Sequence, residues 1–509
     1  MEHLADSHVI GAVSVALVSL ATFYFGFFFF CVIICLALFV RLLSGLSIHV
    51  RERLLTFGIL PLEIRLCLSL GPVSMVTPFI NLYRSSAELE TISQIKLQSI
   101  INWVSQNNEF YRELWLQKES SFLMDLALEK LPIVTKSELR EAESSGKIVS
   151  GGLQSTSNGF WISTSGSTGV PFRLWSLWSE YVLACWYSKR DLLMVSGIWK
   201  GLCCRGVWIL WHGGHLKGWS LLFPGKVFVE SEGYHIESIS NYSPHYIYSP
   251  LSNAIGIASR LRDDPNLLTQ WVPPRCLFTD SELSSKAQRK WISESIKAPV
   301  YDIYASEECF VLGAECKHEN YHIPSDEVII EIVDENGKIV APGTVGRVIV
   351  TSLMRKSMPL IRYEIGDMAA LGIEACPCGN PFPHLTEIHG RMNDLFVLPS
   401  GKEVSVYQLC AFTKVSLEIE KHVGRWQVVQ VDMNNVEVRV TPRKCIEGSE
   451  EGLQKGAELA GGVLLKAVNK ALLDANRNEP SNINISVIVS AELPLHPRGK
   501  RRNFVSNVR

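Results

Sequence analysis

The sequence has almost no net charge and no excess of either sign. Its 509 residues carry 49 Lys and Arg against 51 Asp and Glu, so the composition argues against a nucleic-acid-binding surface. Its 13 cysteines are scattered and include a single closely spaced group of the kind that binds metal, which argues against a disulfide framework and favours reduced thiols. Internal repeats and low-complexity linkers are also absent. A chain of this length exceeds one ordinary core, so we expect at least two domains.

The N-terminal region lacks charge over an unusual length. From Val9 to Val40 (40 − 9 + 1 = 32 residues) there is neither a charged side chain nor a histidine. This run is long enough to cross a bilayer once with tilt, but not twice. Only Glu2 and Asp6 carry charge before it, whereas arginines follow it, so the positive-inside rule predicts a single-pass anchor with the remaining chain in the cytoplasm. A cleaved signal peptide is the alternative, but its basic n-region and small-residue cleavage site are missing.

These features divide the first part of the chain into a tail at 1–8, a transmembrane anchor at 9–40 and a juxtamembrane segment at 41–84. The juxtamembrane segment is also apolar, but Glu63 and Arg65 interrupt it and three prolines break helices. It is more typical of a membrane-surface or core-packing segment than of a second span.

The sequence of the remaining chain is typical of a layered α/β protein. Apolar side chains at helical spacing predict amphipathic helices over 85–130. Between about 160 and 350, β-rich runs alternate with helical stretches, which is typical of α/β layers. The clearest runs are 206–211, 226–229, 245–248 and 299–304.

Two further patterns refine this organisation. Val328–Val333 and Gly346–Thr351 flank an Asn336-Gly337 pair, which predicts a β-hairpin-like region. After Gly390 the chain changes to short strands and one long helix near 451–476, which predicts a smaller α+β domain.

The most informative segment is Ser163–Pro171, in which seven of nine residues are Ser, Thr or Gly. Such a run cannot pack a core, but its hydroxyls and backbone N–H groups can surround phosphate oxygens, because glycine permits tight turns and close approach. Taken alone, the run is equally typical of a flexible loop. Four later segments decide between the two interpretations.

Two of these segments suit a nucleotide. In Tyr301–Glu308, an aromatic side chain at a strand end can stack on a purine, and a carboxylate four residues later can reach a magnesium ion that bridges phosphates. In Pro359–Asp367, an aspartate after glycine can accept hydrogen bonds from both ribose hydroxyls. Separately, the first is typical of an exposed acidic loop and the second of a strand that ends in a Gly-Asp turn.

The other two segments lie toward the C-terminus. His389–Asp394, followed by Pro399-Ser-Gly401, places a Gly-Arg pair beside polar turn residues and suits a hinge that also contacts nucleotide. Pro494–Lys500 is a basic loop near the chain end. A lone basic tail would be a solvated terminus, but a predicted strand at 484–489 and Pro-rich turns precede it, so we expect a positioned lysine.

In this order, the five segments resemble the adenylate-forming superfamily, and in particular its phenylacetate–CoA ligase-like branch, which includes proteins of capsule and exopolysaccharide gene sets. The resemblance covers residues 85–509. It implies an α/β fold with a large N-terminal domain of layered sheets and helices at 85–390 and a small mobile α+β domain at 391–509. It also implies a two-step reaction, in which a carboxylate attacks the ATP α-phosphate to give an acyl-adenylate and a thiol or amine then takes the acyl group.

The resemblance assigns roles to individual residues. Tyr304 flanks the adenine, Glu308 binds Mg²⁺, and Asp367 holds the ribose. Lys500 bridges the carboxylate and the α-phosphate, and with Glu308 and Thr168 it forms the catalytic set. The residues implied in nucleotide binding are Thr164, Ser165, Gly166, Ser167, Thr168, Gly169, Tyr304, Glu308, Asp367, Arg391 and Lys500.

Three positions depart from the branch. Arg173 stands where many relatives have lysine after the phosphate loop, Ala305 where they often have glycine, and Asn393 where they commonly have aspartate. The first puts a phosphate contact in doubt. The third puts the domain rotation in doubt, and such closures often govern turnover.

A cysteine group lies between the second and fourth segments. Two cysteines one residue apart, Cys376 and Cys378, follow Cys316 and His322 and can complete a tetrahedral Cys₃His zinc site. His318 is the alternative nitrogen ligand, and unrelated core cysteines are the alternative to a metal. Some members of the branch carry such a structural site.

The acyl pocket is less defined by the sequence. Tyr248-Ser-Pro-Leu251 lies where the family lines its substrate cleft, as do His212 and Glu282. A lone histidine beside tryptophan is more often a packed residue, and Glu282 is equally ambiguous. We expect ATP, Mg²⁺ and a small carboxylic acid to bind, with CoA or another thiol, or an amine, as acceptor. The main hypothesis is a membrane-anchored acid ligase of surface polysaccharide assembly. The alternatives are a CoA ligase for an aromatic or fatty acid and a non-catalytic membrane scaffold.

Overall fold

The structure is a computed structural model, and all elements described below belong to the unit Asn81–Arg509. It describes residues 77–78, 80–117, 128–155, 159–163, 172–196, 206–210, 225–229, 236–282, 284, 286–391, 395–401, 403–405, 423–442, 450–475, 483–491, 493 and 504–508. The expected anchor at 9–40 lies outside these residues and stays a prediction. Within the described ranges, every helix is too short or too polar to cross a membrane.

The amphipathic helices predicted after residue 85 are present. Helix α5 spans Ser86–Asn107 and begins at a capping box, in which the Ser85 hydroxyl accepts from the Glu88 amide and the Glu88 carboxylate accepts from the Ser85 amide. Its apolar stripe is buried in the main core. Helix α6 (Glu109–Gln117) follows, and α7 (Lys136–Ser144) begins at a second capping box on Thr135.

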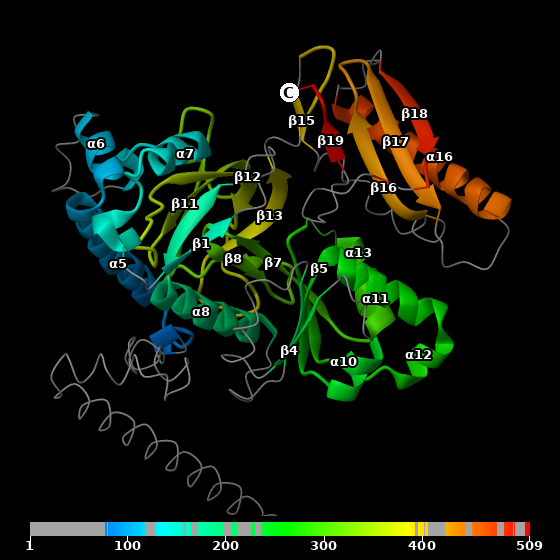
Figure 1. Cartoon of the computed structure of the whole chain (residues 1–509), viewed down its shortest axis with the longest axis horizontal. Helices are drawn as coiled ribbons and strands as arrows, with labels where there is room; N and C mark the ends of the chain where they lie inside the picture. Colours follow the sequence, from blue (N-terminus) through cyan, green and yellow to red (C-terminus); the bar gives the residue numbers. More distant parts are fainter. Residues whose placement is uncertain are drawn as a thin grey trace, which may run out of the picture. The chain divides into compact units, whose positions relative to one another are not determined.

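One half of the central eleven-stranded sheet is parallel. Its strands are β3 (Gly206–Leu210), β4 (Gly225–Val229), β5 (Tyr246–Pro250), β6 (Cys276–Asp280) and β7 (Val300–Ser306), in the order β4-β3-β5-β6-β7. The helices of this half are α10 (Ile236–Tyr242), α11 (Leu251–Asp263), α12 (Pro265–Gln270) and α13 (Lys286–Ile296). Figure 1 shows α11 and α13 side by side along these strands, where they bury an aliphatic cluster. The predicted alternation of strands and helices is therefore confirmed.

The other half of the sheet is antiparallel and continues from β7. Its strands are β8 (Phe310–Glu315), β9 (Tyr321–His322), β10 (Val328–Val333), β11 (Gly346–Ser352), β12 (Tyr363–Leu371) and β13 (His384–Arg391), in the order β8-β9-β13-β12-β11-β10. β10 and β11 pair antiparallel as predicted, and Gly337 turns the chain between them at φ 80°.

Two smaller sheets accompany the central one. β1 (Gly159–Ser163) and β2 (Arg173–Leu177) form an antiparallel pair, and α8 (Trp178–Ser196) follows directly. Toward the C-terminus, β16 (Val423–Gln430), β17 (Asn435–Pro442), β18 (Asn484–Val489) and β19 (Phe504–Ser506) form a four-stranded sheet in the order β18-β17-β16-β19. Helix α16 (Glu450–Ala475) packs on it and buries a separate hydrophobic cluster, whose residues run from 396 to 489. The predicted long helix and final strand are both present.

Candidate active site and metal centre

Tyr304 and Asp367 meet across the sheet although 63 positions separate them. The Tyr304 hydroxyl, near the end of β7, donates a 2.8 Å hydrogen bond to Oδ2 of Asp367 in β12. Arg391, the last residue of β13, is the ladder partner of Asp367. Gly366 has a φ of 88°, a conformation that explains the glycine before the aspartate. The fold thus brings together three residues expected at the adenine, the ribose and the hinge.

Glu308 is buried and paired with a cation. Its Oε1 lies 3.0 Å from the ammonium of Lys136 and 3.4 Å from the hydroxyl of Tyr363. Mg²⁺ in phosphate-transfer sites is held by one or two carboxylates together with substrate phosphates. A buried carboxylate such as Glu308 fits this pattern.

Sequence reasoning missed Lys136. Its ammonium lies 5.8 Å from the ring centroid of Phe172, which follows the phosphate loop directly, as well as beside Glu308. A signal was present in the sequence, because Lys136 is the first residue of a helix after its Thr135 N-cap. The helix dipole disfavours a cation there, so a lysine at this position implies a specific anionic partner.

The predicted phosphate loop closes the hairpin of β1 and β2. Ser163 pairs with Arg173 in the ladder, and the intervening residues include Thr164, Ser165, Gly166, Ser167, Thr168 and Gly169, all outside the described residues. Lys500, the Arg391 side chain and Asn393 also lie outside them. Their predicted roles therefore remain predictions.

Arg173 has a protein partner of its own. A guanidinium nitrogen of Arg173 lies 2.6 Å from Oε1 of Glu143, and the group lies 5.0 Å from the ring centroid of Trp161. Here the arginine that replaces the lysine of many relatives is tied to α7 and β1. Ala305, the second departure, lies at a register shift between β7 and β8.

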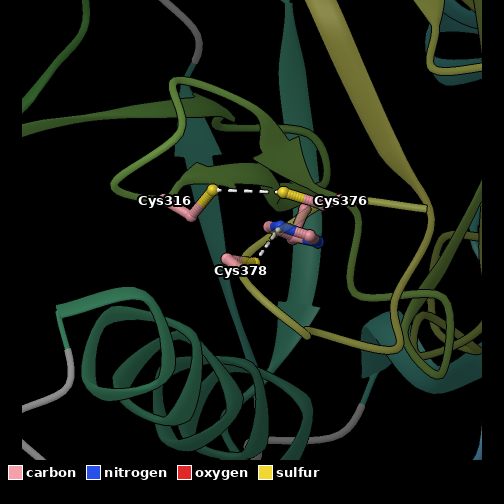
Figure 2. Close-up of side chains that lie close together, drawn as sticks. Cys316, Cys376 and Cys378 are labelled. Atoms are coloured by element: carbon pink, nitrogen blue, oxygen red, sulfur yellow. Dashed lines mark hydrogen bonds between the residues drawn. The ribbon is translucent and has the colours of Figure 1, made fainter. Parts of the chain in front are cut away.

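Four predicted metal ligands converge from two hairpin connections. Cys316 and His322 lie at the end of β8 and in β9, and Cys376 and Cys378 lie between β12 and β13. One ligand atom from each of these residues falls within 4.8 Å of the other three. Figure 2 shows Sγ of Cys316 facing Sγ of Cys376 at 3.6 Å, and the second dashed line marks Sγ of Cys378 to Nε2 of His322 at 3.2 Å. Ligands about 2.3 Å from a tetrahedral ion would lie about 3.8 Å apart, so the set fits Zn²⁺.

Hydrogen bonds around this group leave the correct imidazole nitrogen for a metal. Nδ1 of His322 lies 3.1 Å from the Phe382 carbonyl and donates to it in the fitting tautomer, which turns Nε2 toward the thiols. Burial lowers the pKa of His322 to about 4, so the ring is neutral at pH 7, as metal binding requires. His318, the alternative ligand, has an exposed side chain outside the group.

The thiols differ in their surroundings. At Cys376 the effect of burial is outweighed by hydrogen bonds, chiefly from the Asn320 amide at 3.2 Å, and the pKa of the thiol is lowered. Burial raises the pKa of Cys378 to about 12. A bound cation would favour the thiolate at both positions.

The acyl-pocket candidates receive different positions. Glu282 accepts a 2.8 Å hydrogen bond from the Ser252 amide in the first turn of α11, so its carboxylate caps that helix. Tyr248 donates a 2.8 Å hydrogen bond to Oδ2 of Asp280 at the carboxyl end of the parallel strands. Ligands of open α/β sheets bind at this edge. His212 lies outside the described residues.

Comparison with known structures defines the class of the fold. No family model matches the chain. A 2-hydroxyisobutyryl-CoA ligase in complex with 2-HIB-AMP matches with a TM-score of 0.65 and 19% identity, over 83% of this chain and 90% of that one. An acyl acid amido synthetase in complex with 2,4-DB matches with a TM-score of 0.56 and 14% identity, over 82% and 90%. This is the mixed α/β fold of adenylate-forming enzymes.

Relatives found by sequence narrow the class. The phenylacetate-coenzyme A ligase of Thermus thermophilus is 25% identical over 367 residues, which are 67% of this chain and 78% of the relative. Protein CapK of Staphylococcus aureus is 21% identical over 443 residues, 84% of this chain and 91% of the relative. By sequence and by fold, the chain is therefore similar to the phenylacetate–CoA ligase-like adenylate-forming enzymes, and the resemblance predicted from the five segments is confirmed.

Proposed function

We propose that this protein activates a small carboxylic acid with ATP through an acyl-adenylate and passes the acyl group to a thiol or an amine. The observation that carries the proposal is the hydrogen bond between Tyr304 and Asp367, with Arg391 paired opposite. An aromatic ring beside a carboxylate suits a nucleoside, because the ring stacks on the base and the carboxylate accepts from ribose hydroxyls.

The remaining roles follow from the neighbouring segments. The loop from Thr164 to Gly169 would surround the triphosphate with N–H groups and hydroxyls. Glu308 would hold Mg²⁺, which when bound neutralises charge on the departing pyrophosphate. Lys500 would meet the substrate carboxylate and the α-phosphate, where negative charge grows in the transition state.

For the cysteine group we propose a structural zinc ion. Three thiolates and one imidazole form a closed set of four ligands, which leaves no position for substrate. The ion would join the β8–β9 connection to the β12–β13 connection, and β12 carries Asp367. The zinc would thus stabilise the region that positions the ribose-binding carboxylate.

The proposed location is a membrane surface with the ligase in the cytoplasm. The uncharged run at 9–40 and the arginines that follow it support a single-pass anchor. Such an anchor would hold the active site near a lipid-linked intermediate, in keeping with a role in surface polysaccharide assembly. Membrane flotation of the full chain, compared with a chain that begins at residue 81, tests the anchor. Equal recovery of both in the soluble fraction would contradict it.

The function is tested by separating its two half-reactions. We expect pyrophosphate release from ATP with at least one acid from a panel of aromatic, fatty and hydroxy acids. Lys500→Ala should lower adenylate formation by about 10²–10³ in rate and spare acyl transfer from a supplied acyl-adenylate. Pyrophosphate release that does not change in Lys500→Ala would favour the non-catalytic scaffold, and equal loss of both half-reactions would contradict the role of the lysine.

One observation favours CoA as the acceptor of the acyl group. A relative that matches over 67% of this chain is named as a CoA ligase. Supplying CoA or an amino sugar to the preformed acyl-adenylate distinguishes a thiol acceptor from an amine acceptor. AMP that is released with the amine but not with CoA would exclude a CoA ligase.

A further inference from the structure

Arg355 is a buried cation without a counter-ion among the described residues. Its side chain lies in the loop between β11 and β12 and is 1% exposed. Nη2 donates a 2.9 Å hydrogen bond to the Trp175 carbonyl, whereas Nε and Nη1 have no hydrogen-bond partner. Other buried arginines are paired: Arg190 contacts three carboxylates, and Arg289 contacts Glu315 at 2.6 Å. Arg355 differs from these arginines because it has no carboxylate partner among the residues that the structure describes.

The loop around Arg355 is held firmly, so the guanidinium cannot simply turn out to water. The Glu180 carboxylate accepts from the backbone amides of Lys356 at 2.8 Å and Ser357 at 2.9 Å, as well as from the Ser357 hydroxyl. The Trp175 amide donates to Sδ of Met358 at 3.2 Å. Because Glu180 is occupied by these donors, it positions the loop and does not form an ion pair with Arg355.

Arg355 contacts two residues that lie close in the sequence to predicted phosphate-site segments, Trp175 and Phe310. Trp175 in β2 is two ladder positions from Arg173, whose pairing with Ser163 closes the phosphate loop. On another side, the guanidinium lies 5.9 Å from the ring centroid of Phe310, two residues after Glu308. The guanidinium thus lies beside strand β2, which follows the predicted phosphate loop in the sequence. It also lies near the turn that carries Glu308, the predicted magnesium ligand.

An unpaired buried guanidinium is costly. Removing a charge from water costs several kcal/mol unless a partner compensates it, and arginine stays protonated even where burial lowers its pKa. Buried groups without partners in native structures usually serve a ligand, an ion or ordered water. The Trp175 carbonyl accepts from Nη2 alone, and the Glu180 carboxylate accepts from the loop amides. In the described part of the chain, Nε and Nη1 therefore lack an acceptor, and an anion would match their charge.

We propose that Arg355 binds an oxyanion, and that the oxyanion is a phosphoryl group at the β,γ end of ATP or of released pyrophosphate. The proposal rests on the proposed function and deepens it by adding a phosphate-binding residue outside the five sequence segments. Guanidinium N–H groups match phosphate oxygens in geometry and charge. A substrate carboxylate has the same chemistry and is the second source that the experiment separates.

The test measures binding to the full chain by calorimetry, so it does not depend on turnover. The probes are magnesium pyrophosphate, ATP, AMP and acetate. In Arg355→Met, which keeps the volume and removes the charge, we expect pyrophosphate and ATP to bind about 10- to 100-fold more weakly. AMP, which lacks the β,γ end, should bind as it does to the parent.

The matched control is Lys356→Met, which removes the same charge one position away at the surface. It should change pyrophosphate affinity by less than about twofold. If Arg355→Met does not fold by circular dichroism, Arg355→Lys replaces it, and the loss of the planar fork should still weaken pyrophosphate binding. Arg355 variants that bind pyrophosphate and acetate like the parent would overturn the proposal. A loss confined to acetate would assign the oxyanion to the acid.

Failure of this inference is distinguishable from failure of the proposed function. If the parent forms acyl-adenylates while Arg355→Met keeps full pyrophosphate affinity, only the role of Arg355 is wrong. If the parent forms no adenylate with any acid, the proposed function fails. Selective loss of pyrophosphate binding in Arg355→Met would then still support the oxyanion site.

Discussion

The two halves of the eleven-stranded sheet are stabilised by different means. In the parallel half, α11 and α13 bury aliphatic side chains such as Ile257 and Leu261 against the strands. A described ion pair on its helices, Arg262 with Glu294 at 3.9 Å, is exposed. In the antiparallel half, buried ion pairs join segments that are far apart in the sequence. They include Arg362 with Glu331. A further buried pair joins the two halves, because Arg289 of α13 contacts Glu315 of β8.

The largest of these networks surrounds Arg190, which is completely buried in α8. Its guanidinium lies 2.6 Å from Oδ2 of Asp326, 2.6 Å from Oε1 of Glu327 and 2.7 Å from Oδ1 of Asp191. It also lies 5.2 Å from the ring centroid of Phe382, whose carbonyl orients His322. The network therefore contacts the residue whose carbonyl orients His322 in the proposed metal-binding group.

This difference has a functional consequence. The residues assigned to adenine, ribose, magnesium and zinc all lie in the antiparallel half or at its border with β7. Their positions depend on charged and polar partners that reach across the sequence, whereas the parallel half depends on each strand and its neighbouring helix. Substitutions of charged residues should therefore affect the two halves unequally.

The largest effect is expected at the metal-binding group. The variant Cys376→Ser with Cys378→Ser should lose a bound zinc that the parent holds at about one ion per chain, and should lose stability on the order of 5 kcal/mol. Elemental analysis and urea unfolding measure both quantities. His318→Ala, in the same connection, should keep the metal. A parent purified without chelators that holds no zinc would refute the assignment.

The second effect compares one arginine from each half. Arg190→Met leaves three buried carboxylates without their counter-charge and should cost about 3–5 kcal/mol. Arg262→Met removes an exposed ion pair and should cost less than about 1 kcal/mol. Urea denaturation of both variants measures the contrast. If the two variants lost similar free energies of unfolding, the proposed difference between the halves would be wrong.

The third effect depends on pH. Burial raises the pKa of Asp191 to about 6, against the attraction of Arg190. The folded protein then holds a proton that the unfolded chain releases near pH 4, so this group makes folding less favourable as pH rises from about 4 to about 6. Asp191→Asn keeps an acceptor for Nε of Arg190 and removes the titration.

The stability of Asp191→Asn relative to the parent should therefore increase across that interval by on the order of 2 kcal/mol and then level off. Thermal unfolding at closely spaced pH values measures this difference. Parallel curves for parent and variant would show that Asp191 is ionised throughout.

The smallest effect concerns the hydroxyl of Tyr304. Tyr304→Phe removes the hydrogen bond to Asp367 and should raise KM for ATP about fivefold, equivalent to about 1 kcal/mol, with little change in kcat. Tyr248→Phe removes a comparable bond to Asp280 in the parallel half and should change KM for the acid instead. If either variant changed KM for ATP and KM for the acid alike, the nucleotide site and the acid site would not be separate.

Much of this arrangement could be predicted from the sequence. Strands such as 328–333, the long helix near 451–476 and the four metal ligands follow from local pattern and spacing. The partner of Glu308 could not be predicted, because Lys136 lies 172 positions away in the sequence and no periodicity links the two residues. The sequence already favoured His322 over His318, and the coordinates add that His322 is buried beside the three cysteines whereas His318 is exposed.

By itself, the sequence determined which short segments could bind a nucleotide, since glycine, hydroxyl and carboxylate spacing is a local property of the chain. Only the tertiary structure decided which of those groups meet. It placed Tyr304 against Asp367 and left Nε and Nη1 of Arg355 without an acceptor among the described residues. The physical reason is that hydrogen bonds and charge pairs depend on distance in space, and an antiparallel sheet joins residues without regard to their separation along the chain.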